Sequence, residues 1–246
     1  MQQRNRREKS DGLGYYTQWD KSRENGCIYC GNRADTREHI PSKVLLLEPY
    51  PENLPTIPAC FECNNGFSAD EEYFVSFLET LKSVIYIDYS ISDHIIKIFD
   101  HTPALQEMVT SSIHLENKTV SFSYDEIRFK RVINKLAVCH AGYEFDHVDF
   151  NDPISTKISF VFNMTPEDIS EFTTPEIMNC VPEISSRFTS NCCIIQNINN
   201  DEAYLLNDWI VVQEGRYQYY IYLNTHGGVS IKMIILDFLY CQVDFA

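Results

Sequence analysis

The chain has 246 residues, of which 44% are hydrophobic and 13% are aromatic, and its net charge is -15. This composition is that of a folded globular protein and excludes a disordered chain. Apolar runs stay below the roughly 18 residues of a membrane-spanning helix, and the charged first residues lack the apolar segment of a secretory signal. We therefore expect a cytoplasmic protein with no membrane partner.

The charge is distributed unevenly along the chain. Residues 1–43 hold nine Lys and Arg against six Asp and Glu, a balance of +3, whereas residues 44–246 hold eleven against twenty-nine, a balance of -18. Screening acts over roughly 8 Å at physiological salt, so a basic surface can bind an anion although the rest of the chain is acidic. The pattern favours nucleic acid as the partner of the N-terminal part and a protein as the partner of the acidic C-terminal part.

The first 83 residues divide into a basic segment, residues 1–20, and a cysteine-bearing module, residues 21–83. We expect the basic segment to be a flexible arm that either orders on a partner or stays a solvated tail. In the module, a turn at Asn25-Gly26 precedes two C-x2-C pairs with the spacing of a four-cysteine zinc site. The four predicted ligands are Cys27, Cys30, Cys60 and Cys63.

Thiolates on a structural Zn²⁺ are favoured over disulfides, because the nine cysteines are odd in number and no secretory signal precedes them. A closed four-thiolate site keeps no open position for catalysis. The other five cysteines fall in apolar stretches, and we expect them to be small buried hydrophobes: Cys139, Cys180, Cys192, Cys193 and Cys241.

Candidate catalytic residues lie within and next to the loop that the two cysteine pairs would close. His39 is suited to act as a general base on water near neutral pH. Glu38 and the side-chain carbonyl of Asn64 are oxygen ligands suited to a hard divalent cation, Mg²⁺ or Mn²⁺, and Asn53 could hold the loop and the His39 ring in place. Basic residues near the histidine are expected to contact nucleic acid: Arg33, Arg37 and Lys43.

The helices are predicted from capping residues and apolar spacing. Four prolines over residues 45–58 predict an ordered loop, after which Ser68-Ala-Asp-Glu71 has the pattern of a capping box. A helix over residues 69–83 follows from its apolar spacing. Further helices are predicted after Pro103, over residues 125–141 with Asp125 as the N-cap, and after Pro166.

The strands are predicted mainly beyond residue 155, so that residues 84–246 form an α+β domain built on an antiparallel sheet. A hairpin is also expected around Glu116-Asn117-Lys118. The predicted strands are rich in β-branched and aromatic residues and lie over residues 157–162, 192–195, 209–212, 217–223 and 231–235.

Residues 27–68 resemble the HNH endonucleases, whose ββα-metal finger is often stapled by a zinc ion on four cysteines. The matching segments are, in order, Cys27-x2-Cys30, Arg37-Glu38-His39-Ile40-Pro41-Ser42-Lys43, Asn53-Leu54 and Pro58-Ala59-Cys60-x2-Cys63-Asn64-Asn65. The resemblance implies His39 as the general base, Glu38 and Asn64 as ligands of the catalytic cation, and Asn53 as the residue that orients the loop. The fold expected is α+β, a zinc-stapled ββα-metal finger followed by a mixed helix and antiparallel-sheet domain.

The activity that this resemblance implies is hydrolysis of phosphodiester bonds, with DNA favoured, by one Mg²⁺-like ion and with 5′-phosphate products. Many HNH endonucleases carry a Lys three residues after the position of Asn64, where this chain has Phe67, so Arg33, Arg37 or Lys43 would contact the phosphate instead. A defence or toxin-type effector controlled by a partner protein would have this organisation. The alternative is a non-catalytic, zinc-stabilised interaction module whose acidic C-terminal domain docks a protein partner.

Two other groups with ligand-type side chains are assigned no site. Cys139-His140, near Asp146-His147, falls on the predicted helix over residues 125–141, where a core or helix-end role is expected. Asp93-His94 and Asp100-His101 are expected to be solvated. The tyrosines of residues 217–222 are explained by a strand with one buried face.

Overall fold

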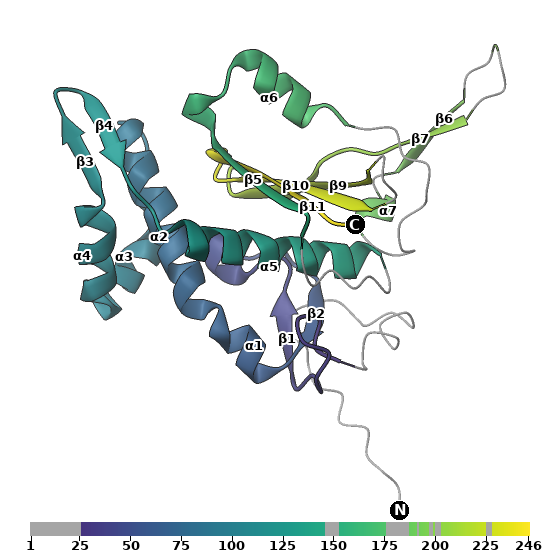
Figure 1. Cartoon of the computed structure of the whole chain (residues 1–246), viewed down its shortest axis with the longest axis horizontal. Helices are drawn as coiled ribbons and strands as arrows, with labels where there is room; N and C mark the ends of the chain where they lie inside the picture. Colours follow the sequence, from purple (N-terminus) through teal and green to yellow (C-terminus); the bar gives the residue numbers. More distant parts are fainter. Residues whose placement is uncertain are drawn as a thin grey trace, which may run out of the picture.

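A five-stranded antiparallel sheet lies at the centre of the fold (Figure 1). The computed structural model describes residues 26–145, 153–175, 187–190, 192–196, 199, 203–224 and 228–246. The strands of the sheet stand in the order β5 (Ser155–Phe160), β11 (Leu239–Asp244), β10 (Val229–Ile235), β9 (Tyr217–Leu223) and β8 (Ile210–Gln213). Every residue of β10 is buried, because helices cover this central strand on both faces.

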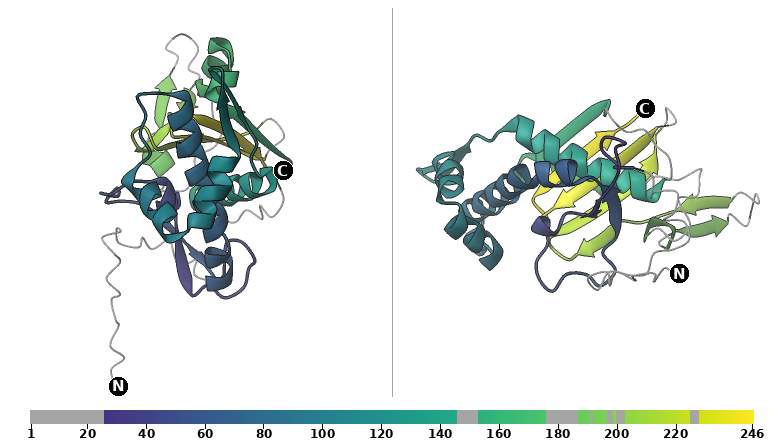
Figure 2. Two further views of the ribbon diagram at one scale, coloured as in Figure 1. Left: turned by 90° about the vertical axis from the view of Figure 1, so that its left-hand side faces the viewer. Right: turned by 90° about the horizontal axis from the view of Figure 1, so that it is seen from below.

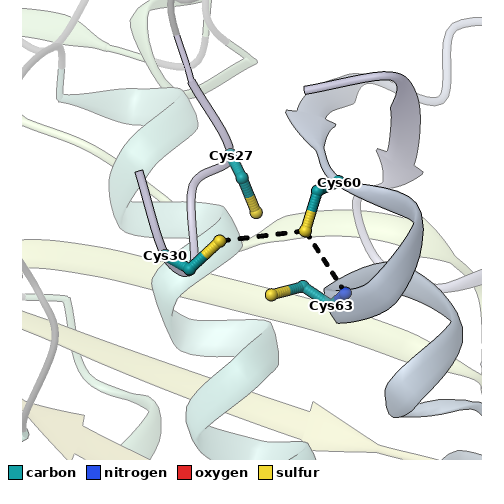
Figure 3. A group of neighbouring side chains, drawn as sticks. All are labelled: Cys27, Cys30, Cys60 and Cys63. Carbon is teal, nitrogen blue, oxygen red and sulfur yellow. Dashed lines mark hydrogen bonds between the residues drawn. The ribbon is translucent and has the colours of Figure 1, made fainter. Parts of the chain in front are cut away.

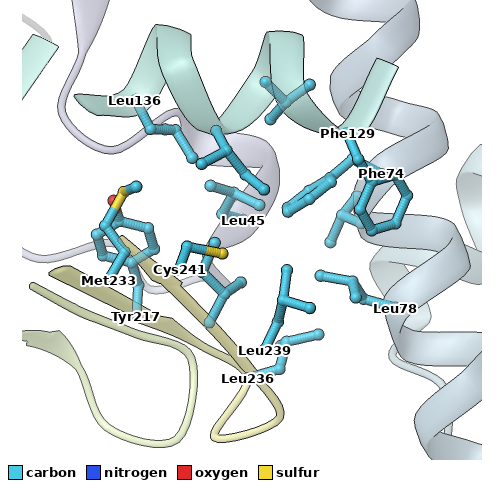
Figure 4. Close-up of a cluster of buried hydrophobic side chains, with 14 of the residues drawn as sticks. Leu45, Phe74, Leu78, Phe129, Leu136, Tyr217, Met233, Leu236, Leu239 and Cys241 are labelled. Atoms are coloured by element: carbon cyan, nitrogen blue, oxygen red, sulfur yellow. The ribbon is translucent and has the colours of Figure 1, made fainter. Parts of the chain in front are cut away.

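One face of the sheet is covered by α5 (Glu126–Glu144), which packs against α2 (Ser68–Ile85), and the right-hand view of Figure 2 shows α5 lying across the strands. Asp125 caps α5 as predicted, accepting hydrogen bonds from the backbone N–H groups of Ile127 and Arg128, each at 3.1 Å. The main core fills the space between these two helices and the sheet (Figure 4); its side chains include Leu45, Phe74, Phe129, Leu136, Met233 and Leu239.

The opposite face of the sheet carries α6 (Pro166–Thr173), drawn above the strands in Figure 1. Thr165 and Asp168 form a capping box at its N-terminus, so the helix predicted after Pro166 begins at that proline. The ring of Phe172 lies 5.2 Å from the ring of Tyr240, and Trp209 Nε1 donates to the carbonyl of Thr173 at 2.8 Å. These contacts fix α6 to the sheet.

Two short helices and a hairpin extend beyond the end of α2, at the left of Figure 1. They are α3 (Asp93–His101), α4 (Pro103–Ser111), β3 (Ile113–Glu116) and β4 (Thr119–Phe122). Asn117 and Lys118 join the strands with φ angles of 50° and 65°, the geometry of a tight two-residue hairpin turn. The hairpin was predicted at this place. Smaller elements are η2 (Lys43–Leu45), η3 (Val161–Asn163), α7 (Arg187–Ser190), β6 (Cys193–Gln196) and β7 (Ala203–Leu206).

The N-terminal module is a two-stranded antiparallel pair, β1 (Thr36–His39) and β2 (Thr56–Ala59), followed by α1 (Phe61–Gly66). It lies beneath α5 in Figure 1. A Cβ atom on Gly142 of α5 would lie 2.5 Å from Ile28 Cδ1, so glycine permits this close approach. Leu45, Leu46 and Leu54, from the connection between the strands, belong to the main core. The module and the sheet domain are therefore packed around one core.

The mixed α+β class with antiparallel sheets was predicted correctly, but the capping box at Ser68 was not. Phe67 is the N-cap of α2 and no side chain caps the helix, because α1 ends at Gly66, immediately before Phe67, and Ser68 already lies in α2. The carboxylate of Glu71 instead contacts Lys135 of α5. The glutamate of the predicted capping box thus takes part in a tertiary contact.

Two further expectations need correction. β11 and β7 were not predicted from the sequence, although β11 is the second strand of the sheet. Cys139 and Cys241 are buried as expected, but Cys193 is exposed, and Cys180 lies outside the described residues. None of the helices in the described residues is both long enough and apolar enough to cross a membrane.

His140 is a core residue, as expected for its place on the amphipathic helix. It is fully buried, its Nε2 atom lies 2.8 Å from the hydroxyl of Tyr217, and its ring stacks on Tyr219 at 3.8 Å between centroids. Burial, with a contribution from Arg187, lowers the pKa of His140 from 6.5 to about 3. The folded protein therefore keeps this imidazole neutral.

The buried imidazole predicts that stability falls as the pH is lowered from about 7 to 5. Below 6.5 the unfolded chain binds a proton on His140 and the folded chain does not until about pH 3, so unfolding is favoured by up to about 1.4 kcal/mol per pH unit. Urea unfolding at pH 7, 6 and 5 measures this slope. His140→Gln should reduce the slope, whereas His101→Gln, at an exposed position on α3, should leave it unchanged.

Candidate metal centre and its surroundings

Four cysteine sulfur atoms converge at the junction of the hairpin and α1 (Figure 3). The ligand atoms of Cys27, Cys30, Cys60 and Cys63 all lie within 4.8 Å of one another. The first two come from the turn before β1 and the last two from the start of α1. This arrangement brings together the two C-x2-C pairs identified in the sequence, and it could hold a structural metal ion.

The local backbone explains why each pair converges. The N–H of Gly31 donates to the carbonyl of Cys27 at 2.8 Å, and Gly31 has a φ of 71°, which closes the first turn tightly. Cys60 is the N-cap of α1, and its sulfur accepts from the N–H of Cys63 at 3.4 Å. Each C-x2-C segment therefore presents its sulfurs through backbone hydrogen bonds.

The sulfur cluster is chemically suited to a soft, four-coordinate cation. Burial raises the pKa of the Cys63 thiol, and its hydrogen bonds with Cys60 and Cys30 raise it further. A cation at the centre would stabilise four thiolates that otherwise repel one another. Four thiolates in a closed arrangement fit the coordination of structural zinc.

The candidate catalytic residues lie on two sides of β1. Because side chains alternate along a strand, Thr36 and Glu38 share one face, and Arg37 and His39 share the other. Asn64 of α1 lies at the first face, where its Nδ2 donates to Thr36 Oγ1 at 3.1 Å and to the carbonyl of Arg37 at 3.3 Å. Glu38 and Asn64 are thus on the same side of the strand.

Glu38 belongs to a buried cluster of charged side chains that the sequence did not indicate. Lys135 Nζ lies 3.2 Å from Glu38 Oε2, donates to Ser42 Oγ at 2.8 Å, and forms a close ion pair with Glu71. Ser42 Oγ also lies 3.2 Å from Glu38 Oε1. The side chains of Lys135, Glu38 and Glu71 are only 0%, 6% and 9% exposed.

The electrostatics of this cluster are set by burial and by mutual contacts. Burial raises the pKa of Glu38; Lys135 opposes the rise, and Glu71 adds to it. Burial alone would lower the pKa of Lys135, but the carboxylates of Glu71 and Glu38 raise it, so the ammonium stays charged. The ammonium of Lys135 is therefore the counter-ion of both carboxylates.

His39 ends β1 and is half-buried, opposite Thr56 of β2. Arg37, on the same face, donates from Nε to Thr56 Oγ1 at 3.1 Å. This face of the hairpin thus carries the candidate base and one of the predicted phosphate-binding cations. Arg33 is exposed in the turn before β1, and the ammonium of Lys43 lies 5.2 Å from the ring centroid of Tyr50.

Asn53, the predicted loop-orienting residue, is exposed and is held by a residue far along the chain. Arg187 Nη2 donates to the Asn53 carbonyl at 2.7 Å and to Asn53 Oδ1 at 3.1 Å. The loop is fastened further by Gln213, which bonds both the N–H and the carbonyl of Leu47 at 2.8 Å. The connection between the two strands is therefore positioned by the sheet domain.

Sequence reasoning missed Lys135, Glu71 and Ser42 as neighbours of Glu38. Ser42 was noted only as part of the segment that resembles the HNH endonucleases, and Glu71 only as part of the predicted capping box. Lys135 carried only a weak signal, since a lysine on an amphipathic helix normally faces water. Its position one turn before the buried Cys139 is the one feature that indicates the inner face of α5.

No family model matches the chain, and neither a curated protein nor a solved structure is significantly similar to it.

We expect the purified protein to contain about one zinc ion per chain, and Cys60→Ser to lose it and to unfold the module. Structural zinc sites supply roughly 10–16 kcal/mol in isolated fingers, far more than this small hairpin could replace. Elemental analysis gives the zinc content, and circular dichroism reports the loss of structure.

The matched control is Cys193→Ser, at an exposed cysteine outside the cluster. It should retain the zinc and the melting temperature of the wild type. Wild-type protein that contains no zinc when freshly purified, or equal zinc in both variants, would contradict the assignment.

Proposed function

We propose that the chain is a metal-dependent endonuclease of the HNH type that hydrolyses phosphodiester bonds of nucleic acid, with DNA favoured. The observation that carries the proposal is the succession β1–β2–α1 with the four-cysteine cluster at the hairpin–helix junction. This order of elements is that of a ββα finger, and the candidate residues Glu38, His39 and Asn64 lie on β1 and α1.

The four-cysteine cluster is proposed to hold zinc as a structural ion. Four sulfurs enclose the position, so water has no coordination site there and the ion is not expected to take part in the reaction. Its effect is to join the turn before β1 to the start of α1, and so to fix Asn64 relative to the strand.

The proposed reaction begins with a proton transfer from water to His39. The oxygen of that water attacks the phosphorus atom, the bond to the 3′-oxygen breaks, and the leaving 3′-oxygen takes a proton from solvent, which gives a 5′-phosphate and a 3′-hydroxyl. A divalent cation, Mg²⁺ or Mn²⁺, supplies stabilisation of the charge on the phosphate and on the leaving oxygen when bound.

Glu38 and Asn64 have the donor chemistry for such a cation. The Nδ2 bonds of Asn64 to β1 set the orientation of the amide and leave its oxygen to act as a ligand. Glu38 lies on the same side of the strand and offers carboxylate oxygens, which hard cations prefer. The carboxylate already contacts Lys135 and Ser42, so a cation would share it with an internal ammonium.

The test of the proposal is plasmid nicking with Mg²⁺ or Mn²⁺. His39→Ala should lower the rate by at least about a hundredfold, since general-base catalysis contributes 10²–10⁴-fold, and should keep the zinc content and the melting temperature. Glu38→Ala and Asn64→Ala should weaken the response to the divalent cation. His101→Ala, at an exposed histidine of α3, is the matched control and should cleave normally.

Cleavage by His39→Ala at the wild-type rate, in a preparation free of contaminating nuclease, would show that His39 is not the base. Absence of cleavage by the wild type on DNA and on RNA would favour the alternative, a zinc-stabilised interaction module.

We also expect weak, salt-sensitive DNA binding that depends on the basic residues of the module. Replacing Arg33, Arg37 and Lys43 by Ala should weaken binding and lower the slope of log K against log salt by about 2–3, since each phosphate contact contributes about 0.9. Fluorescence anisotropy on a duplex at several salt concentrations measures both.

The control removes the same number of charges from exposed positions of the acidic domain, Lys97, Lys118 and Lys157. This variant should bind DNA as the wild type does or slightly less well. Equal loss of affinity in the two triple variants would show that only net charge matters.

A further inference from the structure

Burying the ammonium of Lys135 costs desolvation free energy. Removing a lysine and two carboxylates from water costs several kcal/mol per ion, and their attraction repays this only with good geometry. Apolar side chains of similar volume would often give equal or greater stability at such a position. Stability alone therefore does not account for three charged groups at the contact of β1, α2 and α5.

The contacts of Lys135 are unequal. It pairs most closely with Glu71, donates to Ser42 Oγ at 2.8 Å, and lies 3.2 Å from Glu38 Oε2. The ring centroid of Phe67 is 5.3 Å from the ammonium, which adds a cation–π contact. Glu38 is thus the more weakly held of the two carboxylates, and the one that precedes His39 in β1.

We propose that Lys135 sets the strength of divalent-cation binding at Glu38, by placing a permanent positive charge against the carboxylate that the cation would share. This inference rests on the proposed function for the role of Glu38 as a cation ligand. The ammonium lowers the negative charge available to a divalent ion, and it holds Glu38 through one oxygen while Ser42 contacts the other.

Electrostatics fix the direction of the effects. Removing the charge of Lys135 leaves two buried carboxylates without a counter-ion, so at a pH where Glu38 stays ionised a divalent cation gains attraction at this carboxylate. Removing the charge of Glu71 leaves the ammonium to Glu38 alone, so a divalent cation loses attraction. The two substitutions should therefore change cation affinity in opposite directions.

The experiment measures Mn²⁺ binding to intact, zinc-loaded protein, because Mn²⁺ prefers carboxylate and carbonyl oxygens to thiolates and is detected by electron paramagnetic resonance. Lys135→Met should bind Mn²⁺ at least about tenfold more tightly than the wild type, and Glu71→Gln should bind it more weakly. The double variant with Lys135→Met and Glu38→Gln should not show the increased Mn²⁺ affinity. The rise in melting temperature with added MnCl₂ should follow the same order.

Lys130→Met is the matched control, because it removes the same charge from the exposed side of α5, where Lys130 pairs with Glu126 at 2.7 Å. It should leave Mn²⁺ affinity within about twofold of the wild type. If Lys135→Met does not fold, Lys135→Gln removes the charge and keeps a hydrogen-bond donor to Ser42.

Unchanged Mn²⁺ affinity in the folded Lys135 variant, an equal gain in Lys130→Met, or no Mn²⁺ binding by any variant would overturn the inference. A wild type that does not cleave nucleic acid, but whose Lys135 variant binds Mn²⁺ more tightly through Glu38, would refute the nuclease and leave the inference standing. Cleavage by the wild type, with unchanged Mn²⁺ affinity in the Lys135 variant, would support the nuclease and refute the inference.

Discussion

The ion cluster around Lys135 is the constraint on which the geometry of the N-terminal module depends. Its charged members come from β1, α2 and α5, and each is almost completely buried. Separating any one of them from the others would leave an unpaired charge out of water, at a cost of roughly 3–5 kcal/mol. The strand that carries His39 is therefore fixed to two helices of the main core by electrostatics as well as by packing.

The module needs this attachment because it can bury little of its own apolar surface. Its own apolar cluster consists of Cys27, Ala59 and Cys60; Ile40 and Ile57 pack against Cys139 of α5, and Leu45 and Leu46 insert into the main core. Domains this small generally need a metal or a partner to fold. Here the cysteine cluster fastens one end of the hairpin, and the sheet domain, through Gln213, holds the connection at the other.

Features that depend on local sequence could be predicted, and those that depend on tertiary contacts could not. The C-x2-C pairs and the Asp125 cap are set by spacing within a few residues, so the cluster and α5 followed from the sequence. Glu71 satisfied the pattern of a capping box, but its carboxylate is drawn to Lys135 across the core. β11 was missed although its residues alternate between buried and half-buried positions; it forms a hairpin with the preceding strand β10 and also pairs with the distant strand β5.

The cations of α5 add little to a nucleic-acid surface, although this helix lies next to the module. Arg128 and Arg131 both pair with Asp70 at 2.6 Å, and Lys130 pairs with Glu126. Within the described residues, a phosphate-binding surface on the module would therefore rest on a few unburied cations before and within the hairpin. Proteins that bind duplex DNA tightly use about 6–10 phosphate contacts, and residues 44–246 carry a balance of -18 that repels the backbone. A nuclease built in this way would hold its substrate weakly unless a second protein added contacts, and if such a protein docked on the acidic domain, charge complementarity would favour a basic surface on it.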